Sequence, residues 1–446
     1  MAGLGEGSGL RLGADVVLTL DDADRVYRPG VVDVADGRIT WVGSRADAPP
    51  SATPELAVGG LLMPGLVNTH GHTPMTLLRG SGDGLPLDRW LRESIWPREA
   101  QLTDEDVYWG MLLGADELLR SGVTTTCEMY LHNRALAAAV LDAGIRCVIT
   151  PGIFDLPGGG PDSSWESFLD AAGALHADLH DDDGLVRVGL GPHSAYALPV
   201  EGLRATAKVA GELGALVHVH VAETAEEGRR VGGTHGCSAP ELLARLGVLD
   251  GPVLAAHSVW LGPGDFDIYV DHDVAVAHCP QSNGKLGSGV ARVTEMIDRG
   301  IRVGLGTDGP ASNDNLDLWE EMRLAPLLAR GVTANATAMT ARQALGLATR
   351  GGAEALGLDT GRLEAGRPAD LVRLELNDSM FIPALNLQEL LAHLVWSASS
   401  RHVTDVWVAG RRLVAEGRCT SVDAAVARGE VTRRAHRLFE AARRAR

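Results

Sequence analysis

Residues 61–80 read LLMPGLVNTHGHTPMTLLRG, a short apolar run that ends in the pair His70-Gly-His72. Seven similar runs follow along the chain, and longer amphipathic stretches such as residues 106–122 and 199–215 separate them. This alternation is typical of parallel strands covered by helices. The seven runs are VTTTCEM (123–129), RCVITPG (146–152), VRVGLGP (186–192), LVHVHVAE (216–223), VLAAHS (253–258), VAVAHCP (274–280) and RVGLGTD (302–308). With LLMPGLVN (61–68) they make eight, so we predict an α/β fold with a (β/α)8 TIM barrel over residues 61–368.

Both ends of the chain show a different pattern, in which apolar residues alternate with polar ones and turn residues interrupt them. Residues 1–60 contain ADVVLTL (14–20) and VVDVADGRITWVG (31–43), and residues 369–420 contain DLVRLEL (370–376). VTDVWVAGRRLVAEG (403–417) predicts a hairpin that turns at Ala409-Gly410. We therefore expect a small β-sandwich domain formed by both ends, followed by an exposed Ala- and Arg-rich helix over residues 421–446.

Composition excludes several classes of protein. The net charge of −18 argues against nucleic acid, because phosphate binding needs clustered Lys and Arg. Five widely spaced cysteines form no CxxC pair, which is typical of reduced thiols. The start MAGLGEGSGLRLGAD does not resemble a signal peptide, and no run of about 18 apolar residues predicts a membrane span. We expect a cytoplasmic protein with no nucleic-acid or membrane partner.

Polar residues stand where the predicted strands end, and in a barrel all these ends meet at one rim. They are His70, His72, Glu128, Thr150, His193, His220, Glu223, His257, His278 and Asp308. His70 and His72 alternate on one strand, so both imidazoles face one point. On the fifth strand we choose His220 over His218, because it is nearer the strand end. With Asp308 these residues predict a site for one divalent metal ion, Zn2+ or Fe2+.

A site with two metal ions needs a carboxylated lysine at the end of the fourth strand. The chain has two lysines, Lys208 and Lys285, and neither ends a predicted strand. His193 follows the fourth strand instead. We therefore expect a single ion.

Two further residues could handle protons near the ion. Glu223 is a candidate acid and base, although a surface glutamate that opens a helix is an equally good interpretation. His257 could orient water and stabilise developing charge, or it could be a buried core histidine. His278 is as readily structural as functional. The GxGxxG spacing of Gly304–Gly309 does not indicate a dinucleotide site, because no helix is expected directly after it.

Eight stretches together resemble the amidohydrolase superfamily, and within it the S-adenosylhomocysteine/5′-methylthioadenosine deaminase branch. They are PGLVNTHGHTPMTLLRG (64–80), LPLDRWLRESIWPRE (85–99), TDEDVYWG (103–110), GPHSAY (191–196), HVHVAET (218–224), AAHSVWL (255–261), HCPQSNGKLGSG (278–289) and GTDGPASNDNLDLWEEMRLA (306–325). The resemblance spans nearly the whole chain. Such a combination is far more specific than any single spacing.

The resemblance implies roles for individual residues. The metal ligands would be His70, His72, His220 and Asp308, and the catalytic residues Glu223, His257 and Asp308. Glu99 would grip the ribose hydroxyls, His193 would bind substrate, and Trp90 would wall the purine pocket or serve packing alone. Thr150 stands where relatives that bind the homocysteine carboxylate tend to carry arginine, and the loop over residues 154–166 offers no replacement.

The resemblance also implies the substrate and the reaction. We expect hydrolytic deamination of an adenosine-type nucleoside (S-adenosylhomocysteine, 5′-methylthioadenosine, 5′-deoxyadenosine or adenosine) to the inosine analogue and ammonia, by a homo-oligomer. An alternative is an amidohydrolase for another aminated or chlorinated heterocycle, such as a triazine, guanine or a pterin. Glu223 favours deamination, because triazine dechlorinases of similar sequence can lack a carboxylate there. A catalytically inactive scaffold relative is a third possibility.

Overall fold

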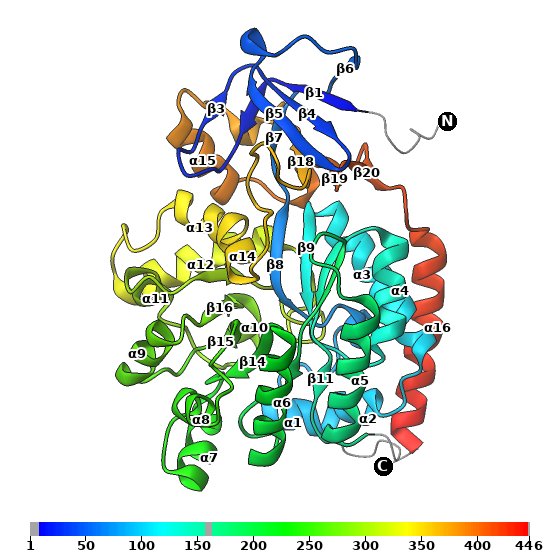
Figure 1. Cartoon of the computed structure of the whole chain (residues 1–446), viewed down its shortest axis with the longest axis vertical. Coiled ribbons are helices and arrows are strands. Elements are labelled where there is room, and N and C mark those ends of the chain that lie inside the picture. The colour runs from blue at the N-terminus through cyan, green and yellow to red at the C-terminus, as the bar shows by residue number, and fades with distance from the viewer. Residues whose placement is uncertain (1–8, 157–162, 445–446) are drawn as a thin grey trace.

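The structure, a computed structural model, describes residues 9–156 and 163–444. The predicted parallel barrel is present and occupies the lower part of Figure 1. Its eight strands are β8 (Leu66–Gly71), β9 (Val123–Glu128), β10 (Arg146–Ile149), β12 (Val186–Val188), β14 (Val217–Val221), β15 (Val253–His257), β16 (Ala275–His278) and β17 (Val303–Leu305). They pair in parallel within two groups of four, and bridges from Leu190 to Val217 and from Gly71 to Asp308 close the ring. At the rim, β11 (Gly152–Ile153) pairs with β13 (Gly191–Pro192).

Helices follow the barrel strands along the chain. They are α3 (Asp104–Arg120), α4 (Asn133–Ala143), α5 (Trp165–Leu179), α6 (Val200–Leu213), α7 (Ala225–His235), α8 (Ala239–Arg245), α9 (Pro263–Asp271), α10 (Pro280–Lys285), α11 (Val293–Asp298), α12 (Leu318–Thr333), α13 (Ala341–Leu347) and α14 (Arg350–Ala355). Helix α3 shows why these segments are helical, since Thr103 and Asp106 form a capping box at its start and its apolar residues line one buried face. No helix among the described residues is both long and apolar enough to cross a bilayer.

The loop after β8 is longer than the others and forms the front of the rim. It contains η2 (Thr73–Leu78), α1 (Leu87–Trp90), the π turn η3 (Leu91–Ile95) and α2 (Trp96–Glu99). Trp90 and Glu99, both predicted site residues, therefore reach the barrel mouth from one loop.

The two ends of the chain form two further sheets, as predicted. One has the order β5 (Arg38–Ser44), β4 (Gly30–Ala35), β1 (Leu10–Ala14) and β6 (Glu55–Ala57). The other has the order β21 (Arg418–Cys419), β20 (Arg411–Ala415), β19 (Val403–Val408), β18 (Leu371–Leu374), β7 (Leu61–Pro64), β2 (Val16–Leu18) and β3 (Val26–Tyr27). Leu12 and Val32 of the first sheet pack in one core with Leu62 and Trp407 of the second.

The terminal sheets lie at the amino ends of the barrel strands, away from the rim (Figure 1). A buried ion pair joins Arg146, the first residue of β10, to Asp370 just before β18, with Nε and Oδ2 2.8 Å apart. The hairpin between β19 and β20 is confirmed, and Ala409 and Gly410 both adopt the positive φ that its two-residue turn requires. Short segments complete this part: η1 (Arg45–Asp47), η4 (Ser379–Phe381), α15 (Leu387–Trp396) and η5 (Ser400–His402).

Two expectations need correction. The run over residues 61–68 is not one strand, because Gly65 separates β7, which pairs with β2 and β18, from the barrel strand β8. The last helix, α16 (Ala424–Arg444), is not exposed on all sides, because it packs along α3 and buries Val431, Leu438 and Arg434. Arg434 pairs with Asp106 of α3 at 3.2 Å, an interaction between distant segments that composition does not reveal. Two segments named above lie outside the described residues: residues 1–8, at the start that does not resemble a signal peptide, and residues 157–162, in the loop that offers no replacement arginine.

Candidate metal centre and active site

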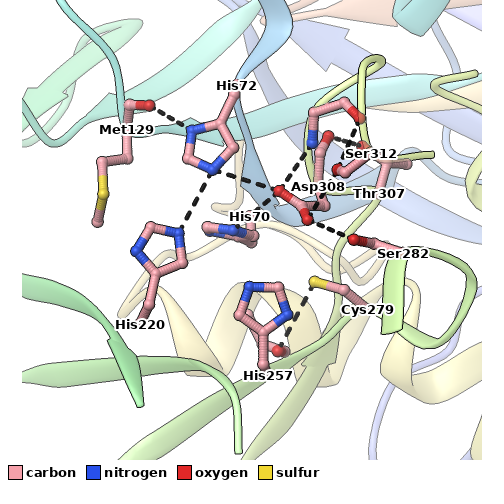
Figure 2. Close-up of polar contacts among 12 residues, drawn as sticks. His70, His72, Met129, His220, His257, Cys279, Ser282, Thr307, Asp308 and Ser312 are labelled. Carbon is pink, nitrogen blue, oxygen red and sulfur yellow. Dashed lines mark hydrogen bonds and ion pairs between the residues drawn. The ribbon is translucent and has the colours of Figure 1, made fainter. Parts of the chain in front are cut away.

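The four predicted metal ligands meet at the carboxyl ends of the barrel strands (Figure 2). His70 is the next-to-last residue of β8, His72 follows that strand, His220 lies on β14 and Asp308 follows β17. The Nε2 atoms of His70 and His72 each lie 3.3 Å from Asp308 Oδ1, and the Nε2 atoms of His220 and His72 are 3.4 Å apart. Side chains up to 238 positions apart in the chain thus face one point.

The second nitrogen of each ligand imidazole is held by a partner behind it. These contacts are Met129 O at 2.5 Å for His72, His193 O at 2.8 Å for His220 and His218 Nε2 at 2.7 Å for His70. A carbonyl oxygen can only accept, so Nδ1 of His72 and of His220 carries the proton. In the neutral rings each Nε2 then has a lone pair that points to the common centre, the orientation that metal-binding histidines need.

The residues fit a divalent cation by geometry and by chemistry. The buried Nε2 of His70 makes no hydrogen bond within the described part of the chain, although Asp308 Oδ1 is 3.3 Å away. Bonds of about 2.0–2.1 Å to a tetrahedral ion place neighbouring ligand atoms about 3.3–3.4 Å apart, and the observed separations match. Three imidazoles and one carboxylate suit a borderline ion such as Zn2+ or Fe2+. Ligand atoms of His70, His72 and His220 and of His70, His257 and Asp308 form two overlapping groups of this kind.

Asp308 is held in its ionised form. Burial raises its pKa, but the adjacent imidazoles of His70 and His72 outweigh burial and place the pKa well below its ordinary value. Its other oxygen, Oδ2, accepts hydrogen bonds from Ser282 Oγ at 2.6 Å and Ser312 Oγ at 2.9 Å (Figure 2). The backbone of Asp308 adopts a left-handed φ of 58°, which an aspartate tolerates only where its surroundings fix it.

His257 faces the same centre with one defined nitrogen. Its Nδ1 lies 3.0 Å from Asn283 Oδ1, an acceptor, so Nδ1 holds the proton and Nε2 is free to accept one. That Nε2 is 3.9 Å from Glu223 Oε2. The φ of His257 is 70°, a second left-handed residue at the rim. The tautomer of His257 thus suits proton transfer at Nε2.

Glu223 is buried in the cavity and is no surface residue. It is 5% exposed, and helix α7 begins two positions later. Burial is the main cause that raises its pKa. The carboxylate of Glu227 accepts from the backbone N–H of Ala222 at 2.9 Å and of Glu223 at 2.8 Å, so it fixes the loop that presents Glu223.

Sequence reasoning missed Glu227, Asn283 and Ser282. One signal for Glu227 was available, because Thr224 caps α7 and Glu227 stands three residues later, the spacing of a capping box. Its carboxylate, however, reaches residues before the cap. Asn283 and Ser282 lie on the short helix α10 after β16, and no periodicity indicates which way they face.

A cavity opens above the candidate metal centre, with about 660 Å³ of empty space that includes its open mouth. Its walls come from the β8 loop and from the ends of several strands. The lining includes His72, Leu87, Trp90, Leu91, Trp96, Glu99, Tyr130, Phe154, His193, Tyr196, His220, Glu223, His257, Leu286 and Asp308. All three predicted substrate residues, Trp90, Glu99 and His193, are among them.

These three residues differ in what they offer. Trp90 donates from Nε1 to Ser81 O at 2.9 Å, so its ring is fixed as a wall. Glu99 is buried, and burial raises its pKa to about 7. Burial lowers the pKa of His193 to about 3, and its ring centroid lies 4.7 Å from that of His220. His193 is therefore a neutral ring beside the ligands.

Other strand-end residues lie outside the cavity. Thr150 is fully buried with Oγ1 2.9 Å from His218 Nδ1, so it does not face the cavity, although it stands where relatives tend to carry a substrate-binding arginine. Glu128 accepts from Thr73 Oγ1 at 2.6 Å and fixes the start of η2. His278 is buried and does not line the cavity.

Lys285 pairs with Asp314, and Lys208 lies on the exposed surface of α6. Neither ends a strand of the described chain.

The chain matches known proteins over most of its length. Residues 61–413 match the Amidohydrolase family. A 5-methylthioadenosine/S-adenosylhomocysteine deaminase of Pelotomaculum thermopropionicum is 40% identical over 426 residues, 95% of this chain and 97% of that one. A 5′-deoxyadenosine deaminase of Methanothermobacter thermautotrophicus is 41% identical over 391 residues, 87% of this chain and 90% of that one.

A solved structure shows the same architecture. The crystal structure of an adenosine deaminase from Xanthomonas campestris with bound zinc superposes with a TM-score of 0.92 at 34% identity and covers 97% of this chain and 98% of that one. The family match over residues 61–413, the sequence identity over nearly the whole length and the shared fold all point to one family. The chain belongs to the amidohydrolase family.

Proposed function

We propose that this chain is a metal-dependent hydrolase of C–N bonds that deaminates adenosine-type nucleosides to their inosine analogues and ammonia. One observation carries the proposal: Glu223, His257 and Asp308 line one cavity with His72 and His220, and His70 belongs to the same cluster of candidate metal ligands. Deaminases of 5-methylthioadenosine, S-adenosylhomocysteine and 5′-deoxyadenosine among its relatives support the substrate class.

We assign the metal site to His70, His72, His220 and Asp308. An ion bound there would lower the pKa of water toward neutrality and so supply hydroxide for attack. We propose Zn2+ as the ion, supported by the zinc in the related deaminase structure, with Fe2+ as the alternative. Elemental analysis of purified protein distinguishes the two.

Glu223 and His257 would move the protons. The raised pKa of the buried Glu223 keeps its carboxyl protonated up to higher pH, so it can donate to the ring nitrogen beside the reacting carbon. Electron density then shifts from that carbon, which favours attack. His257 Nε2 and the ionised Asp308 are placed to take the proton that the water loses. That proton can then pass to the departing nitrogen, which leaves as ammonia, and the proton of the new hydroxyl group restores the carboxyl of Glu223.

Glu99, His193 and Trp90 would position the nucleoside. An ionised Glu99 offers two acceptor oxygens to the two ribose hydroxyls. Trp90 and the neutral His193 present flat surfaces to the base. Each role follows from the family resemblance and from the position of the residue on the cavity wall.

A direct assay tests the proposal. Metal-replete protein is incubated with S-adenosylhomocysteine, 5′-methylthioadenosine, 5′-deoxyadenosine and adenosine, and the change from adenine to hypoxanthine absorbance is followed. We expect conversion of at least one substrate, and conversion about 10²- to 10⁴-fold slower by the Glu223→Gln variant. Failure with all four would contradict the proposal, and a parallel screen of guanine, pterins and triazines would then identify the alternative. Protein that holds no stoichiometric metal would instead indicate an inactive scaffold.

We also propose that the enzyme is a cytoplasmic homo-oligomer. Size-exclusion chromatography with light scattering measures the assembly directly, and a monomer at micromolar concentration would contradict it.

A further inference from the structure

We infer that His218 and Thr150, neither of which lines the cavity, set the protonation of the metal ligand His70. The inference rests on the proposed metal site and assigns it two positioning residues. His218 is fully buried on β14, two positions before the ligand His220. Its Nε2 lies 2.7 Å from His70 Nδ1, and its Nδ1 lies 2.9 Å from Thr150 Oγ1.

The direction of these hydrogen bonds follows from Thr150, the residue of this series that is farthest from the metal site. The hydroxyl of Thr150 has one proton, and it donates that proton to Glu128 O at 3.1 Å, an atom that can only accept. Toward His218, Thr150 Oγ1 must therefore accept. Nδ1 of His218 is then the protonated nitrogen, and its Nε2 is the acceptor.

The tautomer of His218 decides which ring nitrogen of His70 carries the proton. Because His218 Nε2 accepts, His70 Nδ1 must donate, and the proton of the neutral His70 ring is on Nδ1. The remaining Nε2 has a lone pair, and it is the buried nitrogen that makes no hydrogen bond among the described residues and lies 3.3 Å from Asp308 Oδ1. In the opposite tautomer a proton would occupy the position that a metal ion needs.

His70 differs from the other two ligand histidines in this dependence. Backbone carbonyl oxygens hold His72 and His220, and a carbonyl oxygen can only accept a hydrogen bond. An imidazole can donate or accept at either nitrogen, so His218 orients His70 only if something orients His218. The hydroxyl of Thr150 orients His218. The thiol of Cys127, 3.5 Å from the same His218 Nδ1, is a much weaker acceptor and cannot replace the hydroxyl.

The test compares zinc affinity among four variants, measured by competition with a chromophoric chelator. His218→Asn keeps a polar group near Thr150 but loses the acceptor for His70, whereas His218→Gln can place a carbonyl oxygen near the former Nε2. Thr150→Val keeps the shape and removes the hydroxyl. Cys127→Ala is the control. Partners behind a metal ligand typically change affinity or activity about 10- to 100-fold, so we expect that loss for His218→Asn and Thr150→Val.

His218→Gln should bind zinc within a few-fold of the wild type, and Cys127→Ala should match it. With Co2+ in place of zinc, the visible spectrum of His218→Asn should shift and that of His218→Gln should return toward the wild-type spectrum. Melting temperatures check folding, and Thr150→Val decides the question if His218→Asn does not fold.

Several outcomes would overturn the inference. Equal zinc affinity of wild type and Thr150→Val would remove the role of the hydroxyl. Equal losses in His218→Asn and His218→Gln would mean that ring volume, and not the acceptor, matters. Wild-type protein that binds no zinc would contradict the proposed function as well, whereas tight wild-type binding with unaffected variants would contradict this inference alone.

Discussion

Two His-x-His pairs, one on β8 and one on β14, face the same barrel interior but play different parts. On β8 both members offer Nε2 to the metal centre, whereas on β14 only His220 does and His218 lies behind His70. The strand geometry explains the difference. The pairing of β8 with β9 shifts its register between Leu66 and Val67 and again between Asn68 and Gly71, and His72 follows the strand with φ −130° and ψ 55°.

Strand β14 is regular throughout, with His218 opposite Leu254 and His220 opposite Ala256. Two residues along a regular strand advance by about 6.6 Å, so the two imidazoles belong to different layers of the barrel interior. The comparison teaches that the motif itself does not decide how many ligands a strand supplies. An irregular strand end lets two side chains converge, and a regular one separates a ligand from its support.

The largest effect is expected from the ligand members of the two pairs. His72→Ala and His220→Ala each remove a nitrogen from the metal centre, so kcat/KM should fall well beyond the roughly 100-fold limit typical of supporting residues. Elemental analysis should show substoichiometric metal. His436→Ala, on the exposed face of α16, is the matched control and should behave as wild type. Full metal occupancy in His72→Ala would contradict the assignment of ligands on β8.

The second largest effect is expected at Glu223, which follows the β14 pair and is not a proposed metal ligand. Glu223→Gln removes the transferable proton, and general acid–base groups contribute about 10²- to 10⁴-fold, so kcat should fall by that range with metal content unchanged. Steady-state kinetics and metal analysis measure both. Glu226→Gln, an exposed neighbour paired with Arg229, is the control and should keep wild-type kcat. A Glu223→Gln enzyme with normal kcat would exclude Glu223 as the proton carrier.

A smaller effect is expected at Glu227, whose carboxylate fixes the loop after β14. In Glu227→Gln one of the two backbone N–H groups loses its acceptor, and an unpaired buried donor costs about 1–3 kcal/mol. We expect a lower free energy of unfolding by that amount and a kcat reduced about tenfold through displacement of Glu223, since small misplacements can reduce rates up to about 100-fold. Chemical denaturation and kinetics check both parts. Unchanged stability and rate would mean that Glu227 supports neither.

The smallest effect concerns pH and the β8 side of the cavity. Burial raises the pKa of Glu99 to about 7, so below that pH the carboxyl is protonated and offers fewer acceptors to the ribose. From this group alone, kcat/KM should fall about tenfold per pH unit below 7. The stability contribution has the opposite sign: it is fully present below the ordinary pKa of 4.5 and is lost as pH rises through about 7.

Glu99→Gln, which does not titrate, is the comparison variant. Its kcat/KM should be lower at pH 8 and should lack the part of the acidic limb that Glu99 causes. Superimposable acidic limbs in wild type and Glu99→Gln would assign that limb to another group.

The sequence by itself determined the barrel and the identity of the residues at its rim. Apolar runs, amphipathic stretches and period-two alternation depend on neighbouring residues only, and the rule that parallel strands end on one rim does the rest. For this reason the sequence alone could predict that His70, His72, His220 and Asp308 lie together, although they come from three separate strands.

Only the tertiary structure decided which way the remaining side chains face. The break at Gly65, the buried face of α16, the direction of Thr150 and the support from Glu227 and His218 all depend on strand register, bulges and contacts between distant segments. A shift of one residue in register turns a side chain to the other face of a strand, and a hydrogen bond acquires its direction from partners far away in the chain. Local sequence patterns contain neither kind of information.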